Sequence, residues 1–324
     1  MAEDLPRFVR RRRPAWEELA QLVERVGRDR LGLDELARLD RLYRRATSDL
    51  ALARAFYPGS DAYVFLNQLC ARAYGAIYRR RPSKARALKR FVLNDFPGTF
   101  VAEIRFFWMA LGLLLAGALT GVVAALAEPA SVEAVVPAEL RAYINKGTLW
   151  TDTVLVSATP LVLGSQILVN NMAVALTAFG MGLTAGLGTG VVLLFNGLHI
   201  GAILTLCFKA DLGFRLLGFM VAHGFVEIAA ILIAGQAGLI LGAAIIAPGE
   251  LSRADALRLR GRRALRLVLG TLPLFFAIGM VEGFVSPGQL FPGWLKLALG
   301  VTLVALLFAY LIKLGRAAAV EDDA

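Results

Sequence analysis

The sequence contains few of the residues that carry covalent or metal chemistry. Among its 324 residues there are two histidines and two cysteines. Cys70 and Cys207 lie far apart along the chain, and we expect no disulfide between them. A catalytic zinc requires three protein ligands, and the chain has no H-E-x-x-H motif. We therefore expect neither a metal nor a cofactor.

Two further signals are missing near the N-terminus. The basic run Arg10–Arg13 is followed by Pro14, Trp16 and glutamates rather than by an apolar stretch, so no cleavable signal peptide is expected. The basic residues are not interleaved with aromatic residues in a recognition motif, so no nucleic-acid partner is expected either.

Hydrophobicity, by contrast, is abundant and unevenly distributed. The chain is 57% hydrophobic with a mean hydropathy of +0.63. Residues 1–99 contain 21 Lys and Arg against 12 Asp and Glu, whereas residues 100–324 contain 14 against 13. The sequence predicts an all-α protein with a basic helical bundle at 1–99, a membrane domain at 100–316 and an acidic tail at 317–324.

Apolar periodicity and turn residues divide the first part into helices. Four are predicted, at Pro14–Val26, Gly32–Phe56, Ala62–Arg80 and Ser83–Asn94.

The membrane domain contains apolar runs of the length that crosses a bilayer. About six spans are predicted, at Phe106–Leu126, Val156–Phe179, Leu187–Phe208, Leu216–Ala247, Val268–Phe284 and Trp294–Ile312. The fourth is too long for one straight crossing, so it is expected to be tilted, broken or extended. A polar outer loop at 127–155 separates the first two spans and should hold a short helix at Pro137–Ile144.

The distribution of arginine predicts the orientation. Segment 249–266 is strongly basic and, like the N-terminal bundle, should be cytoplasmic. It is predicted to be an amphipathic helix at the membrane surface that contacts lipid headgroups. Its basic residues are Arg253, Arg258, Arg260, Arg262, Arg263 and Arg266. Six spans then place both termini in the cytoplasm.

Polar residues inside these spans form the candidate site. A carboxylate in hydrocarbon costs several kcal/mol unless it is paired or solvated. His223 and Glu227 are four residues apart, so a helix places them on one face. The topology puts the following residues between the midplane and the outer surface: Asn170, Asn171, Asn196, His199, His223, Glu227 and Glu282. We expect His223 and Glu227 to face the three asparagines, either as helix-packing hydrogen bonds or as a polar binding site.

Small residues are spaced so that the spans can approach closely. Pairs separated by four residues are typical of helix interfaces in membranes and make a homodimer plausible. The glycines expected at such interfaces are Gly182, Gly186, Gly197, Gly201, Gly224, Gly238 and Gly242.

These motifs together resemble the stage II sporulation protein M family, in its extended branch with a cytoplasmic helical domain. The residues carrying the resemblance are Asn170-Asn171, Gly188-Thr189, Asn196-Gly197, His223-Gly224, Glu227, Pro248-Gly249 and Glu282 to Pro287, with Leu42-Tyr43-Arg44 and Asp49-Leu50-Ala51 in the first part. The resemblance implies a polytopic membrane protein. In sporulating relatives it acts as a scaffold for cell-wall hydrolases, and genes of the extended branch tend to neighbour those of a MoxR-type ATPase and other membrane proteins.

The leading functional hypothesis is therefore a non-enzymatic membrane scaffold in cell-envelope assembly or maintenance, binding lipids and other envelope membrane proteins. The first alternative is a transporter or lipid-translocating protein that uses the polar intramembrane residues. An intramembrane hydrolase is the least favoured, because Ser157 and Ser165 lack a G-x-S-x-G context.

Overall fold

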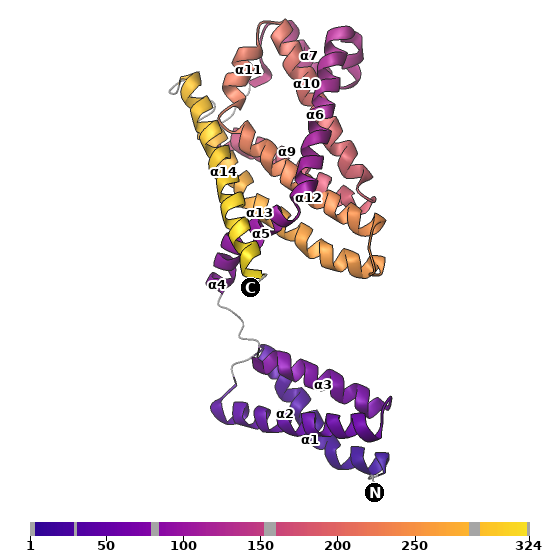
Figure 1. Cartoon of the computed structure of the whole chain (residues 1–324). Helices are drawn as coiled ribbons and strands as arrows, with labels where there is room; N and C mark the ends of the chain where they lie inside the picture. The colour runs from indigo at the N-terminus through magenta and orange to yellow at the C-terminus, as the bar shows by residue number, and fades with distance from the viewer. Residues whose placement is uncertain (1–3, 29–30, 79–83, 152–159, 285–291, 323–324) are drawn as a thin grey trace. The chain divides into compact units, whose positions relative to one another are not determined.

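The computed structural model describes residues 4–28, 31–78, 84–151, 160–284 and 292–322. All regular elements in these ranges are helical (Figure 1), which confirms the predicted fold class. The chain divides into two compact units, Met1–Arg86 and Ala87–Ala324, and each is described by itself.

The first unit consists of three helices, α1 (Leu5–Arg28), α2 (Leu33–Phe56) and α3 (Asp61–Tyr78). Their apolar faces share one core, whose largest members are Phe8, Trp16, Leu19, Leu39, Leu66 and Leu69. The prediction that α1 begins at Pro14 was wrong. Pro14 lies inside the helix on its exposed side, where water can satisfy the carbonyl that loses its partner, and Phe8 extends the buried face by two turns.

One buried carboxylate ties α1 to α2. Asp49 is 4% exposed and accepts a hydrogen bond of 2.9 Å from Trp16 Nε1. Its other oxygen lies 2.9 Å from Arg12 Nε. Because a buried charge is tolerated only when it is paired and hydrogen-bonded, this pair specifies how the two helices dock.

The boundary between the units falls within α4 (Lys84–Arg90), which is followed by one π-helical turn (Phe91–Asp95) and α5 (Phe96–Ala102). The predicted helix Ser83–Asn94 and the boundary at residue 99 therefore differ from the structure, whose first unit ends at Arg86. The reason is burial: Phe96 and Phe100 of α5 are members of the second unit's core.

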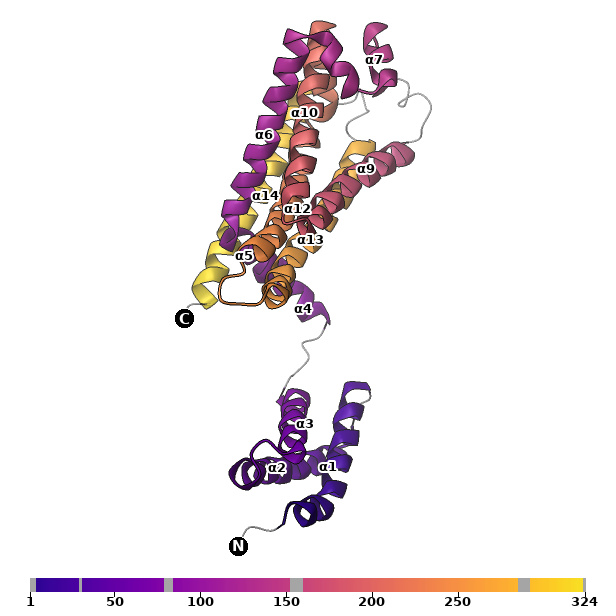
Figure 2. The same ribbon diagram turned by 90° about the vertical axis from the view of Figure 1, so that its right-hand side faces the viewer.

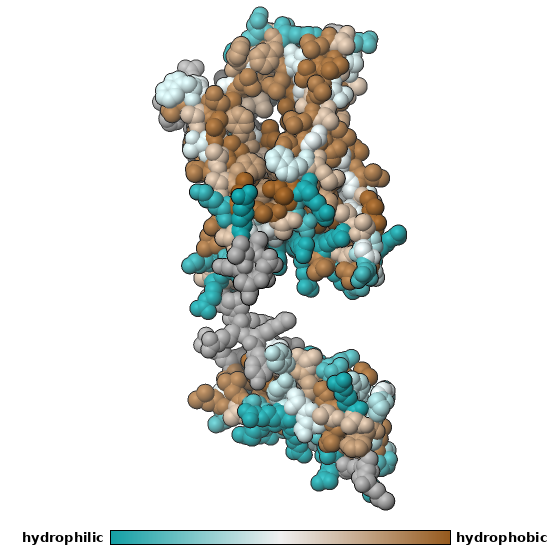
Figure 3. Space-filling model, viewed as in Figure 1, coloured by the Kyte–Doolittle hydropathy of each residue, from teal (hydrophilic) through white to brown (hydrophobic). Residues whose placement is uncertain are grey.

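Five helices of the second unit are long and apolar enough to cross a membrane. Three of these spans are whole helices: Ile104–Ala127 (α6), Leu187–Lys209 (α10) and Gly224–Ile246 (α12). The other two are parts of longer helices: Arg253–Met280 within α13 (Arg253–Phe284) and Gly293–Ala318 within α14 (Gly293–Asp322). A shorter apolar stretch, Leu168–Leu183, covers the end of α9 (Pro160–Gly180) and the 3-10 turn Met181–Leu183. Figure 3 shows a hydrophobic surface on this unit between hydrophilic residues at its two ends.

Helix α12 lies at the centre of this unit (Figures 1 and 2). Of its most apolar 18-residue stretch 83% is buried, against 17% for α14. It packs against α13, α9, α6 and α14, so residues of α12 are in contact with all four of these helices.

The predicted fourth span is broken. It consists of α11 (Gly213–Met220), a turn at residues 221–223 and α12. Segment 249–266 is also different from its prediction: from Arg253 onward it is continuous with the fifth span, since α13 runs without interruption to Phe284. Likewise, the acidic tail begins as the last turns of α14, which ends at Asp322.

The loop between the first two predicted spans contains a 3-10 helix (Pro129–Ala134) and α7 (Ala138–Asn145), which confirms the short helix predicted there. Val132, Val136 and Ile144 pack with the ends of α6 and α10 in a separate core. Lys209 Nζ donates a 2.6 Å hydrogen bond to the carbonyl of Ala125, which joins the same two helix ends. The rest of the predicted loop, residues 152–155, lies outside the described residues.

Candidate functional site

Glu227 and Asn171 form a polar contact between two apolar helices. Glu227 is in the first turn of α12 and is half-buried, and the Asn171 amide of α9 donates a hydrogen bond to its Oε1. Asn170 Nδ2 lies 3.4 Å from Asn171 Oδ1, at the limit of a hydrogen bond. The carboxylate thus has a specific partner from a helix 56 residues away in sequence.

His223 occupies the N-cap position of α12, at the end of the broken span. Its side chain is only 4% exposed, and its ring lies edge-on to Phe219 at 5.6 Å. It lines a cavity of about 250 Å³ whose other walls are apolar residues of the same turn and of α12, α13 and α14. These residues are Ala222, Val226, Leu274, Ala277, Ile278, Leu303 and Leu307.

His223 and Glu227 are one helical turn apart, since the carbonyl of His223 accepts a hydrogen bond of 3.1 Å from Glu227 N. His223 itself is the N-cap residue, with φ −122° and ψ −32°. Glu227 contacts α9, and His223 lines the cavity that α13 and α14 also line.

Neither Asn196 nor His199 is hydrogen-bonded to this contact among the described residues. Asn196 donates its amide to the carbonyl of Val192, 2.9 Å away in its own helix. His199 is on α10, and its Nδ1 is buried without a partner among the described residues. Glu282 lies in the last turn of α13, but its side chain is outside the part of the chain that the structure describes.

The predicted glycines, with one exception, mark close helix contacts. A Cβ added at Gly197 or Gly201 would meet the α6 backbone. A Cβ added at Gly182 or Gly186 would meet the α12 backbone, and one added at Gly242 of α12 would meet the backbone of Gly186. At Gly238 the obstacles are Ala178 O and the Thr189 side chain. Gly224 is the exception, since an added methyl group would meet only Met220 Cβ at 3.9 Å.

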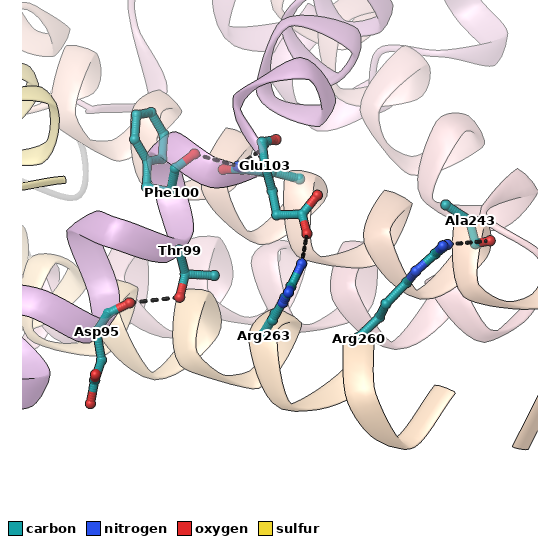
Figure 4. A network of polar contacts seen from close by, with 8 residues as sticks. Asp95, Thr99, Phe100, Glu103, Ala243, Arg260 and Arg263 are labelled. Atoms are coloured by element: carbon teal, nitrogen blue, oxygen red, sulfur yellow. Dashed lines mark hydrogen bonds and ion pairs between the residues drawn. The ribbon is translucent and has the colours of Figure 1, made fainter. Parts of the chain in front are cut away.

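A second polar network, which was missed from the sequence, joins α5, α6, α12 and α13. Gln236 is fully buried and donates its Nε2 to Phe100 O at 3.2 Å and Glu103 O at 3.0 Å. Glu103 itself separates α5 from α6 and pairs with Arg263 at 2.8 Å (Figure 4). Arg260 donates to Ala243 O, near the end of α12, at 2.9 Å (Figure 4). The feature of the sequence that could have revealed this network is Gln236, a polar residue within an apolar run.

This network divides the arginines of α13 into two groups. Arg260 and Arg263 have internal partners, and Arg258 pairs with Asp255 in the preceding turn. Arg253, Arg262 and Arg266 are exposed and have no ion pair among the described residues. They are therefore the arginines best placed to meet an external anion.

The remaining reactive groups among the described residues are the cysteines and the side chains that could ligate a metal. Within the described ranges, no three His, Cys, Asp or Glu residues are grouped so that they could hold a metal ion. In the first unit, burial and then the charge of Asp49 raise the pKa of the Cys70 thiol, which lowers its nucleophilicity. Cys207 is also buried, and both cysteines are free thiols.

Long apolar helices with a buried central helix and internal polar contacts define a multi-span membrane protein. The profile of the stage II sporulation protein M family matches residues 110–287, more than half of the chain. The chain belongs to this family, as the resemblance in sequence indicated. Residues 6–79 match a domain of unknown function, DUF8413, which covers the three helices of the first unit. No curated protein and no solved structure matches the chain.

Proposed function

We propose that the chain is a non-enzymatic scaffold in the bacterial cytoplasmic membrane, with both termini in the cytoplasm. The observation that carries this proposal is the first unit: a helical body with its own core, separate from the membrane unit. Large apolar side chains remain on its surface, including Phe56 at 56%, Tyr74 at 58% and Leu52 at 37% exposure. Exposed apolar groups of this kind support a role in binding other proteins.

The partners proposed are other membrane proteins of the cell envelope, including products of the MoxR-type ATPase gene neighbourhood that the family resemblance implies. A homodimer is a further proposal, which the small-residue faces support. Arg262 and Arg266 would contact lipid headgroups, because exposed cations without an internal partner attract anionic lipid.

Site-specific photo-crosslinking of the full-length chain in cells tests the scaffold role. A photoreactive residue at Phe56 or Tyr74 should form an adduct of discrete mass, whereas one at the exposed Gln21 should not. Leu52 lies one turn before Phe56 on α2, so Leu52→Ser should weaken the Phe56 adduct. An adduct pattern that is the same at all three positions, or unchanged by Leu52→Ser, contradicts the proposal.

A second candidate function, movement of a polar lipid headgroup across the membrane, is favoured by a different observation. Glu227 and Asn171 form a hydrogen-bonded pair in an apolar region, near the cavity that His223 lines. Intramembrane ionisable residues commonly mark a substrate or ion pathway. Vesicles containing the protein should then exchange fluorescent lipids between leaflets faster than empty vesicles, and Glu227→Gln should slow the exchange. Equal rates in empty and protein-containing vesicles would exclude this function.

A further inference from the structure

Helix α14 is held against the rest of the membrane unit at two levels. A Cβ at Gly300 would meet the carbonyl of Val221, and a Cβ at Gly315 would meet the carbonyl of Pro97. Between these two contacts α14 is flanked by hollows. One is the His223 cavity, and the other is a groove of about 370 Å³ on its opposite side.

The groove lies between α6 and α14, and α12 forms its floor. Its lining is apolar and includes Trp108, Leu111, Phe225, Ala229, Phe308 and Ile312. Trp108 is 60% exposed and Phe225 is 40% exposed. The groove is therefore open along one side, within the part of the molecule that a membrane would surround.

Cations gather at one end of this groove. Phe308 and Ile312 are four residues apart on α14, and Arg316 follows at the same spacing, so the three share one face. Arg316 is exposed and has no hydrogen bond or ion pair among the described residues. Arg105 follows the lining residue Ile104 on α6, and Lys313 follows Ile312 on α14.

We propose that this groove binds one acyl chain of an anionic phospholipid whose phosphate is held by Arg316. An apolar groove in a bilayer excludes water and favours hydrocarbon. The guanidinium at its end supplies the planar donors that phosphate prefers. The α6 side of the lining runs only from Ile104 to Leu111, about 11 Å at 1.5 Å per residue, which suits part of an acyl chain better than a whole partner helix. This site is independent of the scaffold role.

Trp108 provides a direct probe of the groove. Replacing Trp150 and Trp294 by phenylalanine leaves Trp108 as the only tryptophan of the second unit, while Trp16 of the first unit is 2% exposed and stays as a constant background. The full-length chain is reconstituted in mixed vesicles in which either phosphatidylglycerol or phosphatidylcholine carries brominated acyl chains. Quenching of Trp108 then reports which lipid occupies the groove.

At equal mole fractions, phosphatidylglycerol should be preferred at Trp108 by about fivefold, the ratio that corresponds to roughly 1 kcal/mol for one basic residue. Arg316→Gln should bring the preference close to one, and Arg316→Lys should keep most of it. Lys146→Gln, a matched loss of an exposed cation at the C-cap of α7, should leave it unchanged. Ala229→Phe, which fills the groove floor, should reduce quenching by both lipids.

Three results would overturn the proposal. Equal quenching by the two lipids would show ordinary lipid contact without a headgroup site. A preference that survives Arg316→Gln would assign the selectivity to other cations. Protection of Trp108 from both lipids would show that a protein segment or a second copy covers the groove.

Discussion

Gln236 offers the sharpest test of how the membrane unit is held together. It is fully buried in the middle of α12, and its amide donates to the carbonyls of Phe100 and Glu103, where α5 ends and α6 begins. Glu103 O also accepts from Phe106 N at 3.0 Å, so the loss of Gln236 would affect Phe100 O most. We predict that Gln236→Leu destabilises the unit by about 2 kcal/mol, within the range for a buried polar group left unsatisfied.

Gln236→Glu should cost more than Gln236→Leu although it preserves the size of the side chain. It removes both N–H donors and places carboxyl oxygens against two carbonyl oxygens. Oε1 of Gln236 is already buried without a hydrogen-bond partner among the described residues. Leucine removes this unsatisfied oxygen, whereas glutamate keeps an oxygen at the same place. The order of stability should therefore be wild type, then leucine, then glutamate.

Thermal unfolding of the purified full-length chain in detergent measures this order. A loss of about 2 kcal/mol corresponds to roughly 4–8 °C for a unit of this size. Ile240→Val, on the same helix and equally buried, is the control and should cost about 1 kcal/mol as a simple loss of packing. If Gln236→Glu melts no lower than Gln236→Leu, the amide does not stabilise the junction as we argue.

Four further predictions follow from other parts of the structure. Gly117→Ala should lower the melting temperature by the equivalent of about 1–3 kcal/mol because its methyl group meets the α10 backbone, whereas Gly112→Ala on the same helix meets nothing within 4 Å and should be neutral. Asp49→Ala should destabilise the first unit by about 3 kcal/mol, measured by Trp16 fluorescence, while Asp40→Ala at an exposed pair should cost under about 0.5 kcal/mol. Cysteines introduced at Glu139 and Arg262 should be labelled from opposite sides of the membrane, and labelling from one side refutes the proposed orientation. Glu227→Gln should melt higher than Glu227→Leu, because an amide can still bond Asn171; equal values would show that the contact adds nothing.

The elements that could be predicted are those whose signals are local. The second helix, predicted at Gly32–Phe56, is observed at Leu33–Phe56, and the short helix predicted at Pro137–Ile144 is α7 at Ala138–Asn145. Apolar period, length and turn residues determine such elements within one segment of chain. Five of the six predicted spans were visible for the same reason, whereas the second, Val156–Phe179, corresponds among the described residues to the shorter apolar stretch Leu168–Leu183.

Features that depend on distant partners could not be predicted. Glu103 and Arg263 are 160 residues apart, and Gln236 meets carbonyls more than 130 residues away. The break at residues 221–223 contains no proline. There the chain packs against α14, whose Gly300 contacts the carbonyl of Val221, a contact that no local pattern of the fourth span reveals.

That break bears on why the fourth span can carry a carboxylate at all. Because α12 begins at Gly224, Glu227 lies in its first turn rather than in mid-helix. Free N–H groups and the positive end of the helix dipole stabilise an acidic side chain there by about 0.3–1 kcal/mol, and the effect fades within one turn. The Asn171 amide adds a hydrogen bond from α9. In a continuous span Glu227 would have only the hydrogen bond from Asn171, without the free N–H groups and the dipole of a helix start. The helix start and the asparagine therefore act together on the Glu227 side chain, and the packing of α14 against Val221 helps to fix where the helix starts.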